Sequence, residues 1–263
     1  MDLGLQNKTA LVAAASRGLG RAVAHELAKE GAKVLIFARG REAVEAARDE
    51  IAASTGADIH AIVADVTADG HVAKVVSETA ARFGPVDILV TNAGGPPAGP
   101  FEAHTWETWE KSVQLTLKSA VELTRAVLPG MRQKRWGRII HVTSIAVKQP
   151  VDNLMLSNSL RSAVTGFART LANEVATDGI TVNCIMPGYT RTERVEELAD
   201  ATANRDGLTR DDILARFERE IPMKRLGEPH EFAAMAAFLA SERASYVTGQ
   251  SIAVDGGWIR SLL

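Results

Sequence analysis

The residues best suited to chemistry lie near the start of the chain, in a turn of small side chains between a strand and a helix. Residues 10–15 form an apolar run that predicts a buried strand, and residues 16–20 open a helix with Val23, Leu27 and Ala28 on one face. Residues 33–38 predict the next strand. Backbone amides at a helix start bind anions, and glycine lets a phosphate come close. The turn is therefore a candidate pyrophosphate site, made of Ala14, Ser16, Arg17, Gly18, Leu19 and Gly20.

The glycine spacing of this turn has two interpretations. Ala14, Gly18 and Gly20 follow the pattern G-x-x-x-G-x-G with alanine at the first position, which differs from the G-x-G-x-x-G of the general dinucleotide fingerprint. The first interpretation is a nucleotide site, and the second is an ordinary strand-to-helix turn of some other α/β protein. The rest of the chain has to decide between them.

Composition favours a small-molecule partner in the cytoplasm. The 263 residues include 30 Lys and Arg against 32 Asp and Glu, without a long run of one sign, so neither nucleic acid nor a membrane surface is expected. The single Cys184 excludes an internal disulfide framework and lies in an apolar run, which predicts a buried thiol. No apolar segment has the length of a signal peptide or a membrane span. The six histidines lack metal-ligand spacing, so no metal is expected.

Strand and helix patterns alternate along most of the chain and predict one α/β domain with a parallel sheet. Further strands are expected over residues 58–64, 86–91, 138–143, 180–186 and 250–254, and helices over 41–53, 66–83, 105–131 and 228–240. Ligands bind outside the carboxyl ends of such strands, so residues 16–20, Asp65 and residues 92–95 should meet in one crevice. Residues 189–226 are charged and helical in composition. We call them the excursion; they predict a lid over the sheet or, alternatively, a solvated linker.

Several motifs, in order, resemble the short-chain dehydrogenase/reductase family over nearly the whole chain, and above all its 3-oxoacyl-carrier-protein reductase-like branch. They are LVAAASRGLG, DVT, TNAGG, HVTS, VNCIMPG and RLGEPHEFAAMAAFLASERASYVTGQSIAVDGG. The resemblance implies a Rossmann-type doubly wound parallel sheet of about seven strands in one domain, residues 1–263. It also implies NAD(P)(H) in the crevice and a homotetramer or homodimer.

The same resemblance locates a catalytic site in which most of the usual residues are replaced. The family uses Asn, Ser, Tyr and Lys, with Tyr thirteen residues after Ser and Lys four residues after Tyr. Ser144 is retained, whereas the other positions are Thr116, Ser157 and Arg161. The flanking sequence matches the family without a gap, so the register is secure. The only tyrosines are Tyr189 and Tyr246, at other places, and His104 is the alternative proton donor or a plain loop residue.

These replacements change the expected chemistry. In the family mechanism a phenol of pKa about 10, lowered by a nearby ammonium, protonates the carbonyl oxygen. A serine hydroxyl is a far weaker acid, and losing a positioned general acid costs about 10²- to 10⁴-fold in rate. The candidate catalytic residues are Ser144, Ser157 and Arg161. Arg161 keeps its charge and donors, so it could hold the nicotinamide ribose or an oxyanion; the alternative is a surface arginine.

The end of the second strand predicts the choice of cofactor. An acidic residue there would bind the adenosine ribose and favour NAD(H), but the chain has Ala38, Arg39, Gly40 and Arg41. NADP(H) is therefore favoured, with Arg17 and Arg39 as a clamp for the 2′-phosphate unless both are simply solvated. The resemblance adds adenine contacts, a back wall and nicotinamide contacts. These are Asp65 and Val66, then Asn92, Ala93 and Gly94, then Pro187, Gly188, Thr190 and Thr192.

Two functions follow from these observations. The first is an NADP(H)-dependent oxidoreductase acting on a carbonyl or alcohol, supported by the intact cofactor side. The second is a dinucleotide-binding sensor or assembly subunit without dehydrogenase turnover, supported by the missing phenol. Both bind the dinucleotide, so turnover discriminates between them.

Overall fold

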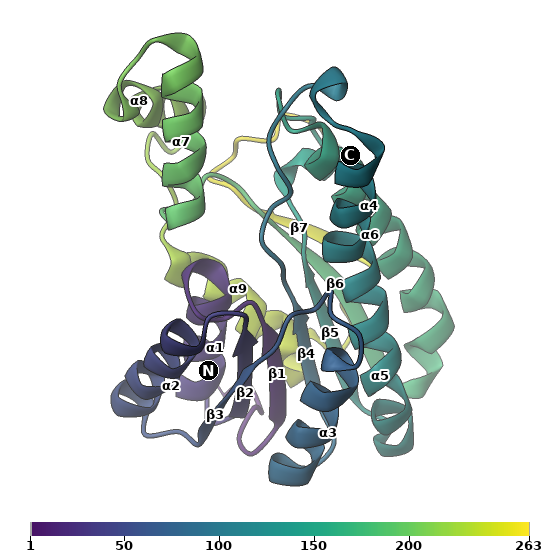
Figure 1. Cartoon of the computed structure of the whole chain (residues 1–263). Helices are drawn as coiled ribbons and strands as arrows, with labels where there is room; N and C mark the ends of the chain where they lie inside the picture. The colour runs from purple at the N-terminus through teal and green to yellow at the C-terminus, as the bar shows by residue number, and fades with distance from the viewer. Residues whose placement is uncertain (1, 263) are drawn as a thin grey trace.

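Seven parallel strands form one sheet in the computed structural model, which describes residues 2–262 (Figure 1). The order is β3-β2-β1-β4-β5-β6-β7, so the chain reverses direction across the sheet between β1 and β4, as in a doubly wound fold. The strands are β1 (Thr9–Ala13), β2 (Lys33–Ala38), β3 (Ile59–Val63), β4 (Ile88–Thr91), β5 (Gly137–Val142), β6 (Ile180–Pro187) and β7 (Ser251–Val254). The expected seven-stranded Rossmann-type sheet is confirmed.

Helices cover both faces of this sheet (Figure 1). Their bounds are α1 (Gly18–Lys29), α2 (Arg41–Thr55), α3 (His71–Phe83), α4 (Trp106–Val113), α5 (Ser119–Lys134), α6 (Met155–Val175), α7 (Glu193–Asp206), α8 (Arg210–Glu220) and α9 (Pro229–Ala240). α1, α2 and α9 lie on one face, and α3, α5 and α6 lie on the other. Because both faces are covered, the central strands are continuous apolar runs and not alternating ones.

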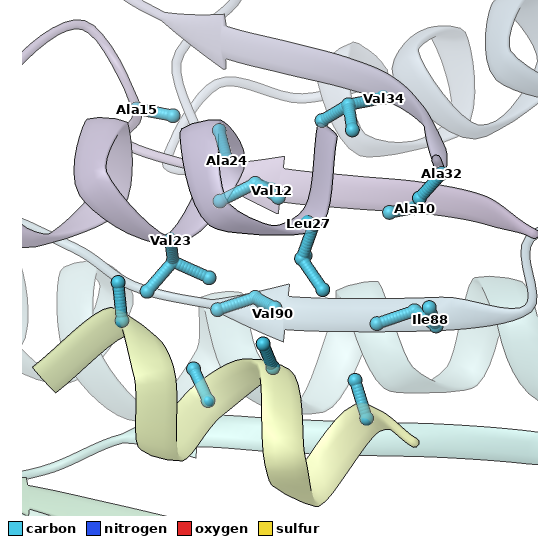
Figure 2. Packing of buried hydrophobic residues seen from close by; sticks show 14 of the residues in the cluster. Ala10, Val12, Ala15, Val23, Ala24, Leu27, Ala32, Val34, Ile88 and Val90 are labelled. Atoms are coloured by element: carbon cyan, nitrogen blue, oxygen red, sulfur yellow. The ribbon is translucent and has the colours of Figure 1, made fainter. Parts of the chain in front are cut away.

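The larger core cluster joins β1 and β4 to α1 and α9 (Figure 2). Val23 and Leu27 of α1 are fully buried and pack near Val90 of β4. The apolar face predicted for this helix is therefore the face that fixes it to the sheet. This packing sets the start of α1 at the carboxyl end of β1, where the small-residue turn lies.

Two predicted helix bounds differ from the structure. Residues 66–70 form a turn, and α3 begins at His71, because Gly70 takes a left-handed conformation (φ 77°) that a continuous helix does not allow. The helix expected over residues 105–131 consists of α4 and α5 joined by a π-helical segment, Gln114–Lys118, and it continues to Lys134. The π-helical segment contains Thr116, and such segments occur often at functional sites.

The excursion forms α7 and α8, which stand beyond the carboxyl ends of the strands (Figure 1). A third apolar cluster packs these helices against the end of β6 and against Trp258. Within it Tyr189 stacks on Phe217, with ring centroids 4.2 Å apart. The excursion is thus a packed helical pair above the crevice, and the linker interpretation is wrong.

Candidate functional site

The turn between β1 and α1 is built to accept an anion. The N-terminal residue of the helix, Arg17, makes no side-chain capping bond, and no acidic residue occupies the first turn. The amides of Gly18, Leu19 and Gly20 therefore remain available, as the first amides of a helix are without intrahelical partners. A Cβ on Gly20 would lie 2.3 Å from the Ala14 carbonyl oxygen, so this close approach needs glycine. These features fit the pyrophosphate of a dinucleotide.

Ala14 carries backbone strain within the same turn. Its φ is 50°, in the left-handed region that favours glycine, at the position where the sequence pattern replaces glycine by alanine. The turn keeps the conformation because Ala15 bonds across to β2, with its amide donating to the Phe37 carbonyl at 3.3 Å. Alanine therefore holds a left-handed conformation at the first position of the predicted glycine pattern.

Arg39 and Asp65 follow β2 and β3, at the end of the crevice where the sequence predicts the adenosine. Asp65 follows β3 and accepts from the Thr67 amide (2.9 Å) and hydroxyl (2.8 Å). Burial opposes ionisation of Asp65, but these hydrogen bonds and the charge of Arg39 lower the pKa of the carboxyl below its usual value. Arg39 is exposed at the end of β2, next to the strand that carries the phosphate turn. A cation at this place suits a phosphate on the adenosine ribose.

The excursion contacts two strand-end loops at once. Arg17 forms an ion pair with Glu193, and the Thr192 methyl group lies 3.6 Å from the Cβ position of Gly18. Arg194, which follows Glu193, donates to the Pro96 carbonyl in the loop after β4 at 3.2 Å. The first turn of α7 therefore bridges the crevice between the phosphate turn and this loop. Sequence reasoning missed Glu193 and Arg194, which belong to no motif.

Ser144 follows the end of β5, and Arg161 bonds to the carbonyls of the two residues before it. The Ser144 hydroxyl accepts from the Ala146 amide at 3.1 Å, which leaves its own hydrogen free to donate. Arg161 on α6 points inward, and its Nη1 donates to the carbonyls of Val142 and Thr143, both at 2.9 Å. The surface-facing alternative for Arg161 is therefore wrong. Its remaining Nε and Nη2 hydrogens have no partner within residues 2–262.

Arg161 is a half-buried cation. Desolvation, followed by the nearby charge of Arg194, lowers the pKa of Arg161 to about 10, and the group stays protonated at neutral pH. No carboxylate of the described chain pairs with it. The guanidinium lines a cavity of about 10 Å³ together with Asn92 and Thr116, and this volume is close to the smallest that holds one water. The buried Thr116 hydroxyl has no hydrogen-bond partner within the same described residues.

The described residues place no phenol in the catalytic position. Burial, followed by the charge of Glu220, raises the pKa of Tyr189 to about 12, and the ring is stacked in the cluster of the excursion. Tyr246 is fully exposed in the loop before β7. His104 lies in the segment between β4 and α4 and contacts that same segment, with its Nε2 3.3 Å from the Gly99 carbonyl oxygen. Ser157 lies one turn before Arg161 on α6, half-buried, so the two share one face of the helix.

The other predicted residues lie at neighbouring strand ends. Val66 begins the turn after β3, and Ala93 lines the small cavity. Ser16 and Gly94 lie in the turns after β1 and β4. Pro187 ends β6, and Thr190 and Thr192 lie between this strand and α7. Gly188 lies close to Asp255 after β7, since a Cβ on this glycine would be 2.7 Å from the Asp255 Cα.

Among residues 2–262, no group of three or more His, Cys, Asp or Glu side chains could hold a metal ion. No helix in that part of the chain is long and apolar enough to cross a bilayer.

Known proteins resemble this chain over almost its full length. Residues 13–259 match the family described as enoyl-(acyl carrier protein) reductase. The chain is 36% identical to the 3-oxoacyl-acyl-carrier-protein reductase FabG of Escherichia coli (strain K12), covering 97% of this chain and 98% of that protein. It is 32% identical to the D-beta-hydroxybutyrate dehydrogenase of Rhizobium meliloti (strain 1021), with 95% and 98% covered. The L-sorbose reductase of Gluconobacter frateurii, solved with NADPH and L-sorbose, superimposes with a TM-score of 0.94 at 35% identity, with both chains fully covered.

The chain belongs to the short-chain dehydrogenase/reductase family. It is an NAD(P)-dependent oxidoreductase of that family, which acts on carbonyl or alcohol substrates.

Proposed function

We propose that this protein is an NADP(H)-dependent oxidoreductase that works without a phenol acid, with Ser144, Ser157 and Arg161 at the reacting carbonyl. The observation that carries the proposal is the cofactor side of the crevice. It combines an uncapped helix start, arginines at the ends of β1 and β2, and no acid after β2. The structures of L-sorbose reductase and of actinorhodin polyketide ketoreductase (TM-score 0.93, 31% identity), both with NADPH, agree with this choice.

The assignment of NADP(H) over NAD(H) depends on charge. A 2′-phosphate needs cationic donors, and Arg17 and Arg39 supply two forked guanidinium groups at adjacent strand ends. Asp65 and Val66 would meet the adenine, and residues 92–94 would form the back wall. Pro187, Gly188, Thr190 and Thr192 would contact the nicotinamide end.

Each catalytic residue has a role that its geometry permits. The free hydrogen of the Ser144 hydroxyl would donate to the substrate oxygen. Arg161 would contact the nicotinamide ribose or stabilise negative charge on that oxygen, because two carbonyls hold this half-buried cation in place and leave it with unpaired donors. NADPH supplies the hydride when bound. Arg161 cannot release its proton near neutral pH, so the oxygen takes its proton from a serine hydroxyl or from water, which predicts slow turnover.

The first experiment is titration of the pure protein with NADPH, NADH and their oxidised forms. Tighter binding of the NADP(H) pair supports the proposal, and absence of affinity for every form overturns it. The second experiment follows NADPH oxidation with a panel of ketones, quinones and acyl thioesters. NADPH binding without turnover on the whole panel would instead favour a dinucleotide sensor or assembly subunit.

A gain-of-function variant tests the roles of the replaced residues. Ser157→Tyr with Arg161→Lys restores the phenol and the ammonium, and adding Thr116→Asn restores the remaining family position. Activity on a generic ketone should rise. The matched control is Ser159→Tyr with Arg169→Lys, on exposed positions of the same helix. A restored variant that binds NADPH but gains no activity over this control would contradict the assigned roles.

The family resemblance also leads us to propose a homotetramer or homodimer and a single domain with the excursion as its lid. Light scattering coupled to size-exclusion chromatography measures the assembly. A monomer at micromolar concentration would contradict the first of these proposals.

A further inference from the structure

Two arginines from separate elements approach the same four-residue turn, residues 92–95, after β4. Arg161 of α6 lines the small cavity with Asn92 and Ala93. Arg194 of α7 lies over Gly95, where a Cβ would be 2.9 Å from its Nη2 and 3.1 Å from its Cζ. The guanidinium of Arg194 therefore occupies the space that a side chain at this position would fill. The two cations reach the crevice from the sheet side and from the lid side.

Both guanidinium groups keep unused donors. Arg161 spends Nη1 on two carbonyls and leaves Nε and Nη2 unpaired within residues 2–262. Arg194 donates from Nη2 to the Pro96 carbonyl, and its Nη1 lies 3.5 Å from the exposed Glu197 carboxylate. A guanidinium carries five N–H hydrogens, and these bonds use only some of them, so each group has capacity for a ligand.

Two acidic residues near this part of the crevice have partners other than Arg161 and Arg194. Glu193 pairs with Arg17, and Asp255 accepts from the amides of Gly257 (2.9 Å) and Ile259 (2.8 Å). Within the part of the chain that the structure describes, Glu197 is the one carboxylate that forms an ion pair with Arg194, and it is half exposed to solvent. Desolvation, and after it the charge of Arg194, lowers the pKa of Arg161, so the two arginines lie close enough for their charges to oppose one another. A negatively charged ligand would remove this cost.

We propose that the substrate of this enzyme carries an oxyanion, a carboxylate or a phosphate, and that Arg194 is the residue that selects it. The inference rests on the proposed function, because it places the substrate carbonyl at Ser144. Arg194 offers a planar fork at the mouth of the crevice, which matches the geometry of both anions. Arg161, deeper in the site, adds positive potential without changing position, since two carbonyls hold it.

The test uses NADPH-loaded protein and two matched pairs of compounds. One pair is a 2-oxo carboxylate and its neutral amide, and the other is a phosphorylated hydroxyketone and its unphosphorylated parent. Binding is measured by the change in nicotinamide fluorescence, and turnover by NADPH oxidation. The wild type should prefer the charged member of one pair, and the preferred pair shows whether the anion is a carboxylate or a phosphate.

Arg194→Gln should weaken binding of the charged compound by about 10- to 100-fold, as expected for the loss of a hydrogen bond to a charged group, and leave binding of its neutral partner unchanged. Arg194→Lys should recover part of the loss, because it returns the charge without the fork. The matched control is Arg205→Gln, an exposed arginine at the other end of α7 that pairs with Asp206.

Three results would overturn the proposal. The first is a wild type that binds neutral and charged members equally, or binds none of the four. The second is that Arg194→Gln weakens binding of the charged and the neutral compound of a pair equally. The third is weaker NADPH binding by that variant, which would assign Arg194 to the cofactor. NADPH affinity is measured separately, so failure of the substrate inference is distinguishable from failure of the proposed function.

Discussion

Neutralising Glu193 should tighten NADPH binding and leave NADH binding unchanged. In the structure this carboxylate pairs with Arg17, one of the two arginines assigned to the 2′-phosphate, and both side chains are largely exposed, at 63% for Arg17 and 57% for Glu193. The phosphate must therefore compete with Glu193 for the same guanidinium. An exposed pair contributes about 0.2–1 kcal/mol. Its removal in Glu193→Gln returns up to that amount to NADPH, which is at most about fivefold in Kd.

The assay is isothermal titration of each protein with NADPH and NADH at low and at high salt. The gain for NADPH should shrink as salt is raised, because solvent screens this exposed pair. Glu197→Gln is the control, since its carboxylate pairs with Arg194 one turn further along α7. Equal tightening of NADPH and NADH by Glu193→Gln would refute the assignment of Arg17 to the 2′-phosphate. Weaker binding of NADPH would refute the competition itself.

Three further predictions concern stability and reactivity. Ala14→Gly should raise the melting temperature in calorimetry by a few degrees, because relief of about 1–2 kcal/mol of left-handed strain exceeds the cost of about 0.4–1 kcal/mol from the greater entropy of the unfolded chain. Gly20→Ala should lower the melting temperature, because its Cβ would lie 2.3 Å from the Ala14 carbonyl oxygen. Burial lowers the pKa of His141 to about 4, so its contribution to the free energy of unfolding is present above pH 6.5 and lost as pH falls toward 4. Between these pH values, the free energy of unfolding from urea titrations should depend less steeply on pH in His141→Asn than in the wild type, by at most about 1.4 kcal/mol per pH unit. Burial raises the pKa of the Cys184 thiol to about 11, so mass spectrometry should find it unmodified by iodoacetamide at pH 8 until urea unfolds the chain.

The fold was predictable because its signals are local and repeated. Apolar runs with both faces covered, ended by glycine or by polar turns, mark each strand in the sequence, and the parallel topology follows from the helices between them. The errors arose where backbone geometry overrides composition. Gly70 delays α3 by using a left-handed conformation, and the π-helical segment around Thr116 continues a helical pattern without changing it.

The candidate site was predictable only where a motif or a strand end locates a residue. The structure brings Ser144 and Arg161 together at the end of β5, as the register implies, and places the predicted cofactor residues at adjacent strand ends. Glu193 and Arg194 were not predictable, because their contacts cross about a hundred or more residues of sequence, to Arg17 and Pro96. Nothing in the composition of a charged helix shows which of its arginines faces a crevice.

We expect the residues at the predicted catalytic positions to depend on one another. A guanidinium is larger than an ammonium and planar, and Arg161 donates to the carbonyls of Val142, the last residue of β5, and of Thr143, which follows it. A cavity of only about 10 Å³ remains beside Thr116. Thr116 lines the same cavity as Arg161, and its side chain is shorter than the asparagine that the resemblance implies at this position. A tyrosine at Ser157 would lie one helical turn from a cation that is already held by the backbone, so its phenol would not gain the mobile ammonium that lowers its pKa in the family mechanism. The site therefore has to be rebuilt at several positions together, since any single reversion leaves either an unfilled space or a cation that the backbone still holds.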